Sequence, residues 1–123
     1  MYRIDERECD ALVSTFNDRS PIHVDQAYAE AAGFPRTISH GAILQGFLSH
    51  FIGMYFPGKR SLILSVNMDY RRPSFIGDEV RLVAQVRQKV ESGQVVVLVF
   101  RFMNTSSKEV VASGKAQVAM RNE

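Results

Sequence analysis

The segment of residues 41–55 limits the possible folds more than any other, because it has the period of a helix that is bulky and apolar on one side and small on the other. Bulky side chains form one broad face: Ile43, Leu44, Phe47, Leu48, Phe51, Ile52 and Tyr55. Small residues form the other face: Ala42, Gly46, Ser49 and Gly53. A helix of this kind is buried on both sides. We therefore expect the bulky side to press on a sheet and the small side to admit another backbone.

This helix is predicted to begin at Ser39 or Gly41, with Ser39 as a possible cap, and to end at Pro57-Gly58. Alternating apolar residues after it predict four antiparallel strands, over 61–70, 80–87, 94–103 and 110–120. The strand at 94–103 is apolar on both faces, which is typical of a central strand. Turns are expected at Ser92-Gly93 and over 104–108, with a bend marked by Pro73 and Gly77-Asp78.

Two shorter helices are predicted before the long one. The first covers 5–16, with a capping box between Asp5 and Glu8 and an apolar stripe of Cys9, Leu12, Val13 and Phe16. Cys9 is interpreted as a core thiol. The second covers 25–32, capped by Asp25 and stopped by Gly33, and its predicted buried side is Tyr28, Ala31 and Ala32. Helices followed by strands predict an α+β fold, with one domain over residues 1–123 and a helix wrapped by a curved antiparallel sheet.

Composition excludes several classes of function. The net charge is only +2 and the sequence contains no long basic run, so nucleic acid is not an expected partner. The most apolar stretch, 42–56, is interrupted by polar residues and shorter than the roughly 20 residues that span a bilayer. The N-terminus shows no apolar run of a signal peptide, and one cysteine gives no disulfide framework. We expect a cytoplasmic protein without a membrane partner.

The segment Asp18-Arg19-Ser20-Pro21-Ile22-His23 places a carboxylate and an imidazole five residues apart on a short turn that Pro21 stiffens. Proton-transfer chemistry uses such a pair, although a structural turn has the same composition. We expect this segment to lie over the small face of the long helix. The three histidines have no metal-ligand spacing, so a metal site is not expected.

The stretch from Asp18 to Asp25 resembles the signature Asp-x-Asn-Pro-apolar-His-x-Asp of the MaoC-like dehydratases and (R)-specific enoyl-CoA hydratases. The resemblance continues in order through His40-Gly41, Tyr70-Arg71-Arg72-Pro73 and Gly77-Asp78. This chain departs from the family pattern at Ser20, where Asn is usual, and at Asn17, where Gly is frequent. Its N-terminal strand is at most a stub over residues 2–4. The resemblance implies a hot-dog fold.

The family activity is the reversible hydration of a trans-2-enoyl thioester to the (R)-3-hydroxyacyl thioester. Asp18 and His23 would activate the water and move the proton, and the Gly41 N–H, at the start of the helix, would stabilise the thioester oxygen. The resemblance matches Ser49 to a helix serine that binds the catalytic carboxylate. The expected substrate is an acyl-CoA or acyl-carrier-protein thioester, with no cofactor.

Three further residues are expected beside the substrate. His40 is more plausible as a partner of the helix end than as a catalyst, while Arg71 and Arg72 would meet the phosphates of CoA or an acidic carrier protein. An exposed sheet edge favours aggregation, so we expect a homodimer with a continuous sheet. Two other functions stay open. The first is a hot-dog thioesterase, although such enzymes usually have an acid on the central helix and residues 41–56 contain none. The second is a non-catalytic subunit that binds acyl thioesters.

Overall fold

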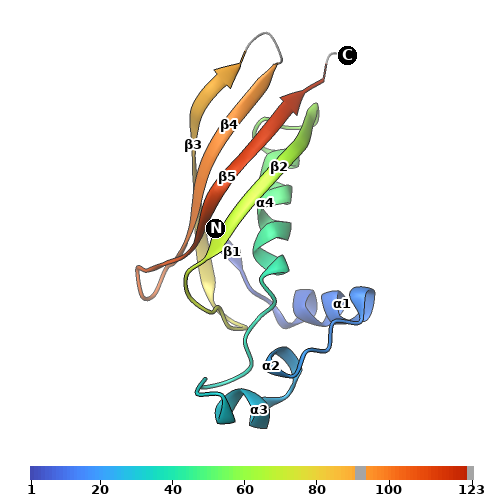
Figure 1. The fold of residues 1–123 in the computed structure, drawn as a ribbon, viewed down its shortest axis with the longest axis vertical. Coiled ribbons are helices and arrows are strands. Elements are labelled where there is room, and N and C mark those ends of the chain that lie inside the picture. The colour runs from blue at the N-terminus through green and yellow to red at the C-terminus, as the bar shows by residue number, and fades with distance from the viewer. Residues whose placement is uncertain (91–93, 122–123) are drawn as a thin grey trace.

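The computed structural model describes residues 1–90 and 94–121. The chain forms β1 (Tyr2–Arg3), then four helices, α1 (Glu6–Phe16), α2 (Pro21–Val24), α3 (Gln26–Ala31) and α4 (Ala42–Met54). Four long strands follow: β2 (Ser61–Tyr70), β3 (Glu79–Val90), β4 (Val95–Asn104) and β5 (Val110–Met120). All pairings are antiparallel, in the order β1-β3-β4-β5-β2. The expected α+β architecture, with one long helix against a curved antiparallel sheet, is confirmed (Figure 1).

The core lies between α4 and the inner face of the sheet. The helix contributes five buried side chains: Ile43, Leu44, Phe47, Leu48 and Ile52. The sheet contributes Val80, Leu98, Phe100, Phe102, Ala116 and Val118. Each large side chain buried in this way stabilises the fold by about 1.5–3 kcal/mol. The predicted bulky face of the helix is therefore correct over most of its length, but Tyr55 is 69% exposed beyond the last helical turn.

The close approach of β2 to β5 depends on Gly114, which is paired with Met68. A Cβ atom on Gly114 would lie 1.8 Å from the Asn67 carbonyl oxygen and 2.9 Å from Cζ of Phe100. No side chain fits at these distances, so this strand position requires glycine.

The small face of α4 is where the sequence prediction was wrong. Ala42, Gly46 and Ser49 are exposed, and a Cβ atom on Gly46 would meet nothing within 4 Å. The segment that carries Asp18 and His23 lies instead with α1, α2 and α3, beyond the N-terminal end of α4 (Figure 1). Two main-chain hydrogen bonds hold the connection to α4 extended and keep α2 away from the helix side. They join Ile38 N–H to the Ile22 carbonyl (3.0 Å) and Ser39 N–H to the Ser74 carbonyl (2.8 Å).

The ends of the helices agree with the sequence in part. Glu8 accepts a hydrogen bond from the Asp5 N–H at 2.9 Å, as the predicted capping box requires, and Asn17 ends α1 in the left-handed conformation. The single turn α2 was not predicted; it has Pro21 at its first position, where the missing N–H costs nothing. Ser39 does not cap α4, because it is buried against Ser74 and Gly41 occupies the cap position.

The predicted buried sides of the two short helices were only partly correct. Cys9 is buried and Leu12 and Val13 are half-buried, but Phe16 is exposed at the end of α1. On α3 the buried residue is Ala29, whereas Tyr28, Ala31 and Ala32 are exposed. The helix is short and rests on α2, so a single residue reaches the interior.

The strand boundaries follow the predicted ones closely, with β3 extending further than expected. The turn over 104–108 is confirmed by the hydrogen bond from Lys108 N–H to the Asn104 carbonyl, and Gly77 has a φ of 96°. The turn predicted at Ser92-Gly93 lies outside the described residues. The N-terminal stub pairs with β3 and makes a fifth strand. Within 1–90 and 94–121, none of the helices has the length and apolar character needed to cross a membrane.

The buried thiol of Cys9 gives a first prediction. Burial raises the pKa of Cys9, and the acidic neighbours Glu8 and Asp10 add to the effect. Because only the thiolate is nucleophilic, we expect the native protein to react with iodoacetamide at pH 8 far more slowly than the protein unfolded in urea. The raised pKa also stabilises the fold below about pH 8.5, and this contribution is lost as the pH rises through the folded value. Equal reaction rates in the two states would contradict the burial.

Candidate active site

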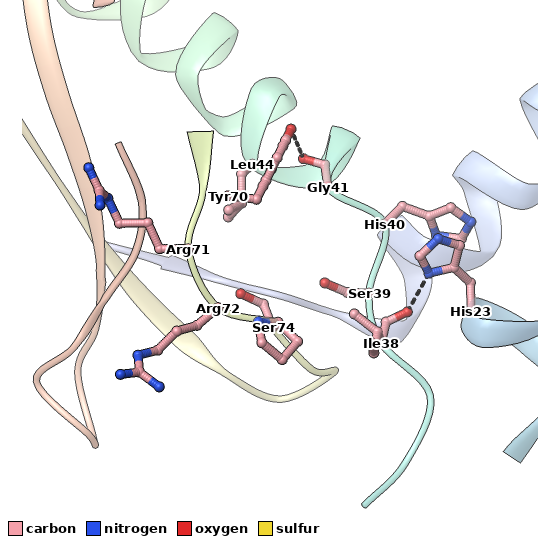
Figure 2. A pocket seen from close by; sticks show the side chains of 11 residues that line it. His23, Ile38, Ser39, His40, Gly41, Leu44, Tyr70, Arg71, Arg72 and Ser74 are labelled. Carbon is pink, nitrogen blue, oxygen red and sulfur yellow. Dashed lines mark hydrogen bonds between the residues drawn. The ribbon is translucent and has the colours of Figure 1, made fainter. Parts of the chain in front are cut away.

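A pocket of about 410 Å³ opens where α2, the connection before α4 and the end of β2 meet. Its walls come from three separate parts of the chain, as Figure 2 shows. They are His23, Ile38, Ser39, His40, Gly41, Leu44, Tyr70, Arg71, Arg72, Pro73 and Ser74. The structure thus brings together five of the seven predicted site residues, while Asp18 and Ser49 are not among the lining residues.

His23 is held by a hydrogen bond that fixes its chemistry. Its Nδ1 lies 2.7 Å from the Ile38 carbonyl oxygen (Figure 2). A carbonyl only accepts, so Nδ1 carries the proton and Nε2 of the neutral ring has a free lone pair. The backbone of the α2 turn is fixed as well, by the bond from His23 N–H to the Ser20 carbonyl at 2.9 Å. His23 is therefore oriented as a proton acceptor at the pocket.

His40 lies between His23 and Asp18. Its ring is buried and stacks on the ring of His23, with centroids 4.0 Å apart and planes 27° apart. Its Nε2 donates to the Asp18 main-chain oxygen at 3.1 Å and lies 3.8 Å from the carboxylate Oδ2. No partner for its Nδ1 is found in the described part of the chain. His40 thus joins the Asp18 segment to the start of α4.

The Asp18 side chain is 48% exposed. Its Oδ1 accepts from the Ser20 N–H at 3.4 Å, which closes a small turn of the kind that Asp often forms. This bond uses the main chain of residue 20, so the local turn forms with Ser as it would with Asn. In the single chain, the contact between Asp18 and the pocket runs through the His40 ring.

Gly41 combines a free donor with close packing. Its N–H has no acceptor among the residues that the structure describes, and it points from the positive end of the helix dipole. The Tyr70 hydroxyl donates to the Gly41 carbonyl at 3.0 Å and accepts from Gln45 Nε2 at 3.1 Å. Sequence reasoning missed Tyr70 as a site residue, although its inward position at the end of β2 was visible in the alternation.

The remaining predicted residues lie further from the imidazoles. Figure 2 shows Arg71 and Arg72 across the pocket from the histidines, with side chains directed away from them. Arg71 donates to Ser113 Oγ at 2.9 Å, and Arg72 forms an ion pair with Glu109. Ser49 is exposed on α4, where no hydrogen bond from its side chain reaches another described residue. Across 1–90 and 94–121, no group of three His, Cys, Asp or Glu side chains has a metal-binding arrangement.

The packing of Tyr70 on Gly41 gives a second prediction. A Cβ atom at Gly41 would lie 2.8 Å from two ring atoms of Tyr70, so Gly41→Ala should displace the ring and lose its bond to the Gly41 carbonyl. We expect the pocket to bind any acyl thioester more weakly, with a rise of about tenfold in KM or Kd. Gly46→Ala is the matched control, since nothing lies within 4 Å of that position. A Gly41→Ala variant with unchanged binding would contradict the packing.

The class of protein follows from comparison with known sequences and structures. The family model of the MaoC like domain matches residues 11–107, so the chain belongs to this family. It is 30% identical over 118 residues to the (R)-specific enoyl-CoA hydratase of Aeromonas caviae, and the aligned region covers 96% of this chain and 87% of that protein. It is 26% identical to the mitochondrial 3-hydroxyacyl-[acyl-carrier-protein] dehydratase of Arabidopsis thaliana, over 91% of this chain and 68% of that protein.

Solved structures agree with the fold. The (R)-hydratase of A. caviae involved in PHA biosynthesis matches with a TM-score of 0.89 and 29% identity, over 98% of this chain and 90% of that one. The predicted hot-dog fold and the predicted family are therefore confirmed. The named relatives are hydratases and dehydratases, so the predicted enzyme class, a lyase, is confirmed as well.

Proposed function

We propose that the protein catalyses the reversible hydration of a trans-2-enoyl thioester to the (R)-3-hydroxyacyl thioester. The observation that carries this proposal is that one pocket contains both Nε2 of His23 and the N–H of Gly41, neither of which has a partner among the described residues. The first is a base for water and the second a donor for the thioester oxygen. The names of the relatives support the same reaction.

In the proposed reaction the water oxygen bonds to Cβ while His23 Nε2 takes one water proton. Electron density moves through the double bond to the thioester oxygen, which the Gly41 N–H stabilises. His23 then returns the proton to Cα, so the ring ends neutral. We assign the Asp18 carboxylate to the second water hydrogen, a role supported by the His40 bridge that joins Asp18 to the ring stacked on His23. Acid–base catalysis of this kind supplies roughly 10²–10⁴-fold in rate.

We further propose that a second copy of the chain completes the site. β2 is at the edge of the sheet, and Leu62, Leu64 and Val66 on it are exposed, as is the small face of α4. Ser49 lies eight residues beyond Gly41, roughly 12 Å along the helix axis, so it can bind an Asp18 carboxylate only across such an interface. Analytical sedimentation of the wild type and of Val66→Glu measures the oligomeric state. We expect the wild type to be a dimer and the substitution to dissociate it. A monomeric wild type would contradict the homodimer.

Crotonyl-CoA provides the direct test of the reaction. We expect the absorbance of its conjugated double bond to fall with wild-type protein, without release of free thiol. Asp18→Asn should retain binding and lose most of the rate, because the neutral amide lacks the negative charge that holds the water by its second hydrogen. Thiol release would identify a thioesterase instead, and binding without turnover would identify a non-catalytic subunit. Either result would refute the hydratase proposal.

A further inference from the structure

The outer face of β4 is apolar although no described helix covers it. Val96, Leu98, Phe100 and Phe102 point inward and are buried. The alternate residues Val95, Val97 and Val99 lie on the opposite side and are half-buried. All the helices lie on the inner side of the sheet or beyond its end (Figure 1). Strands that are apolar on both faces are typical of sheets covered on both sides, so this face has the composition of a contact surface.

Four cations lie around one end of this apolar strip, near Val99 of β4 and Val83 of β3. Arg101 lies opposite both Val83 and Ser113, and Lys115 lies opposite Val99. Arg81 is two residues from Val83 on the same face of β3, and Arg71 reaches the face through its bond to Ser113. Diagonal neighbours on adjacent strands are about 7–8 Å apart, so the cations are contiguous. We call Arg71, Arg81, Arg101 and Lys115, with Val83 and Val99 between them, the outer basic face.

This surface concentrates the excess positive charge of the protein. Two acids lie on the same side of the sheet: Asp69, paired with Ser113, and Glu79, which stands two residues before Arg81 on β3 and forms an ion pair with Arg3. The chain has 15 Lys and Arg against 13 Asp and Glu, so beyond the outer basic face and these two acids eleven cations remain against eleven acids. Within the described chain, none of the four cations forms an ion pair. A hollow beside Arg101 is lined by Val83, Val99 and Phe100 and by the polar residues Gln85 and Ser113, so the centre of the face is partly apolar.

These properties distinguish between possible occupants. A second copy packed on the same face would bring like charges together, which is unfavourable. A single nucleotide would leave most of the broad and partly apolar surface uncovered. An acidic protein helix with apolar residues on one side matches both the charges and the valines. The surface is also continuous with the pocket, because Arg71 lines the pocket and its guanidinium lies on the outer basic face.

We propose that the outer basic face docks the acidic surface of an acyl-carrier protein, which delivers the thioester to the pocket past Arg71. This inference rests on the proposed function and deepens it, because it selects the carrier of the acyl group.

The test measures binding of a purified acidic holo-acyl-carrier protein by titration calorimetry, at low and at physiological ionic strength. We expect wild-type binding that weakens with salt, since Coulombic attraction is screened, and roughly tenfold weaker binding for the Arg101→Glu/Lys115→Glu double variant. The control is Arg7→Glu/Lys59→Glu, which changes the net charge equally at exposed positions outside the face. The milder Arg101→Gln/Lys115→Gln variant serves if charge reversal disturbs folding, and it should weaken binding in the same direction.

Turnover of carrier-bound and CoA-bound substrates tests the docking proposal separately from the proposed hydration. Arg101→Glu/Lys115→Glu should lower kcat/KM for a crotonyl-carrier substrate and leave crotonyl-CoA turnover unchanged. Absence of wild-type binding to the carrier, equal losses in the control, or dissociation of an assembly of copies by the double variant would overturn the proposal. Carrier binding that depends on the face without any hydration would refute the hydratase reaction and leave the docking surface supported.

Discussion

Replacing His23 with asparagine is expected to lower kcat for hydration of crotonyl-CoA by about 10²–10⁴-fold, with little change in KM or in Tm. The reason is the way the ring is held. Nδ1–H of His23 donates to the Ile38 carbonyl, and the asparagine NH₂ group can make the same bond. The basic Nε2 has no counterpart in asparagine, so the variant retains the turn and loses the proton acceptor. Steady-state kinetics together with thermal unfolding measures both properties.

The matched control for this substitution is His50→Asn. His50 lies on the exposed side of α4, where its Nδ1 is 3.0 Å from the Tyr2 hydroxyl, far from the lining of the pocket. We expect its kcat to stay within about twofold of the wild type. If His23→Asn kept wild-type activity while folding normally, His23 would have no part in proton transfer and the proposed reaction would need another base.

Gly114→Ala is expected to give the largest loss of stability of any single methyl addition considered, roughly 3 kcal/mol in the free energy of unfolding. The new Cβ would overlap the Asn67 carbonyl oxygen and touch the Phe100 ring. To accept it, β2 must move away from β5 and the edge of the sheet must open. Differential scanning calorimetry should show a fall in Tm of about 10 °C.

Lys115→Ala tests whether this loss is specific to the glycine. Lys115 follows Gly114 on the same strand with its side chain exposed on the outer face. Removal of an exposed side chain changes stability by about 0.5 kcal/mol or less. A Gly114→Ala protein that melts like Lys115→Ala would show that β2 and β5 are further apart than the structure places them.

The parts of the fold that sequence predicts well are those where one residue pattern has one structural meaning. The run of Ile43, Leu44, Phe47, Leu48 and Ile52 defines a helix face wide enough for a sheet, and the core confirms it. The same holds for 110–120, where Ala112, Ala116 and Val118 are buried, because period-two alternation indicates which side of a strand is buried. In 61–70 a register shift between Ile63 and Ser65 interrupts the alternation, so Ile63 packs on the core while Leu62 and Leu64 are exposed.

Patterns of small residues were less informative. The face containing Gly46 and Ser49 was correctly recognised as distinct, but its neighbour was misassigned, because nothing in the pattern says which segment covers it. In α3, alanines lie on every side, so the choice of Ala29 over Ala31 and Ala32 depends on packing against α2. The position of the Asp18 segment was likewise decided by main-chain hydrogen bonds of Ile38 and Ser39, which side-chain periodicity does not report.

The candidate site was predictable as a set of residue types and only partly as a geometry. Motif spacing identified His23, His40 and Gly41, and the pocket brings them together. It did not reveal that His40 stands between His23 and Asp18, since that contact joins a side chain to the main chain of residue 18. Tyr70 was overlooked because its effect is through the Gly41 carbonyl.

The two main-chain tethers at Ile38 and Ser39 have a consequence for evolution. They involve amide and carbonyl groups, which every residue except proline provides, so the frame of the pocket does not depend on the identity of the side chains attached to it. Mutation can therefore exchange Ile38 for a smaller or larger residue while the His23 imidazole keeps its place. Chains of this architecture can therefore diverge in the size of the group that their pocket admits without rebuilding its frame.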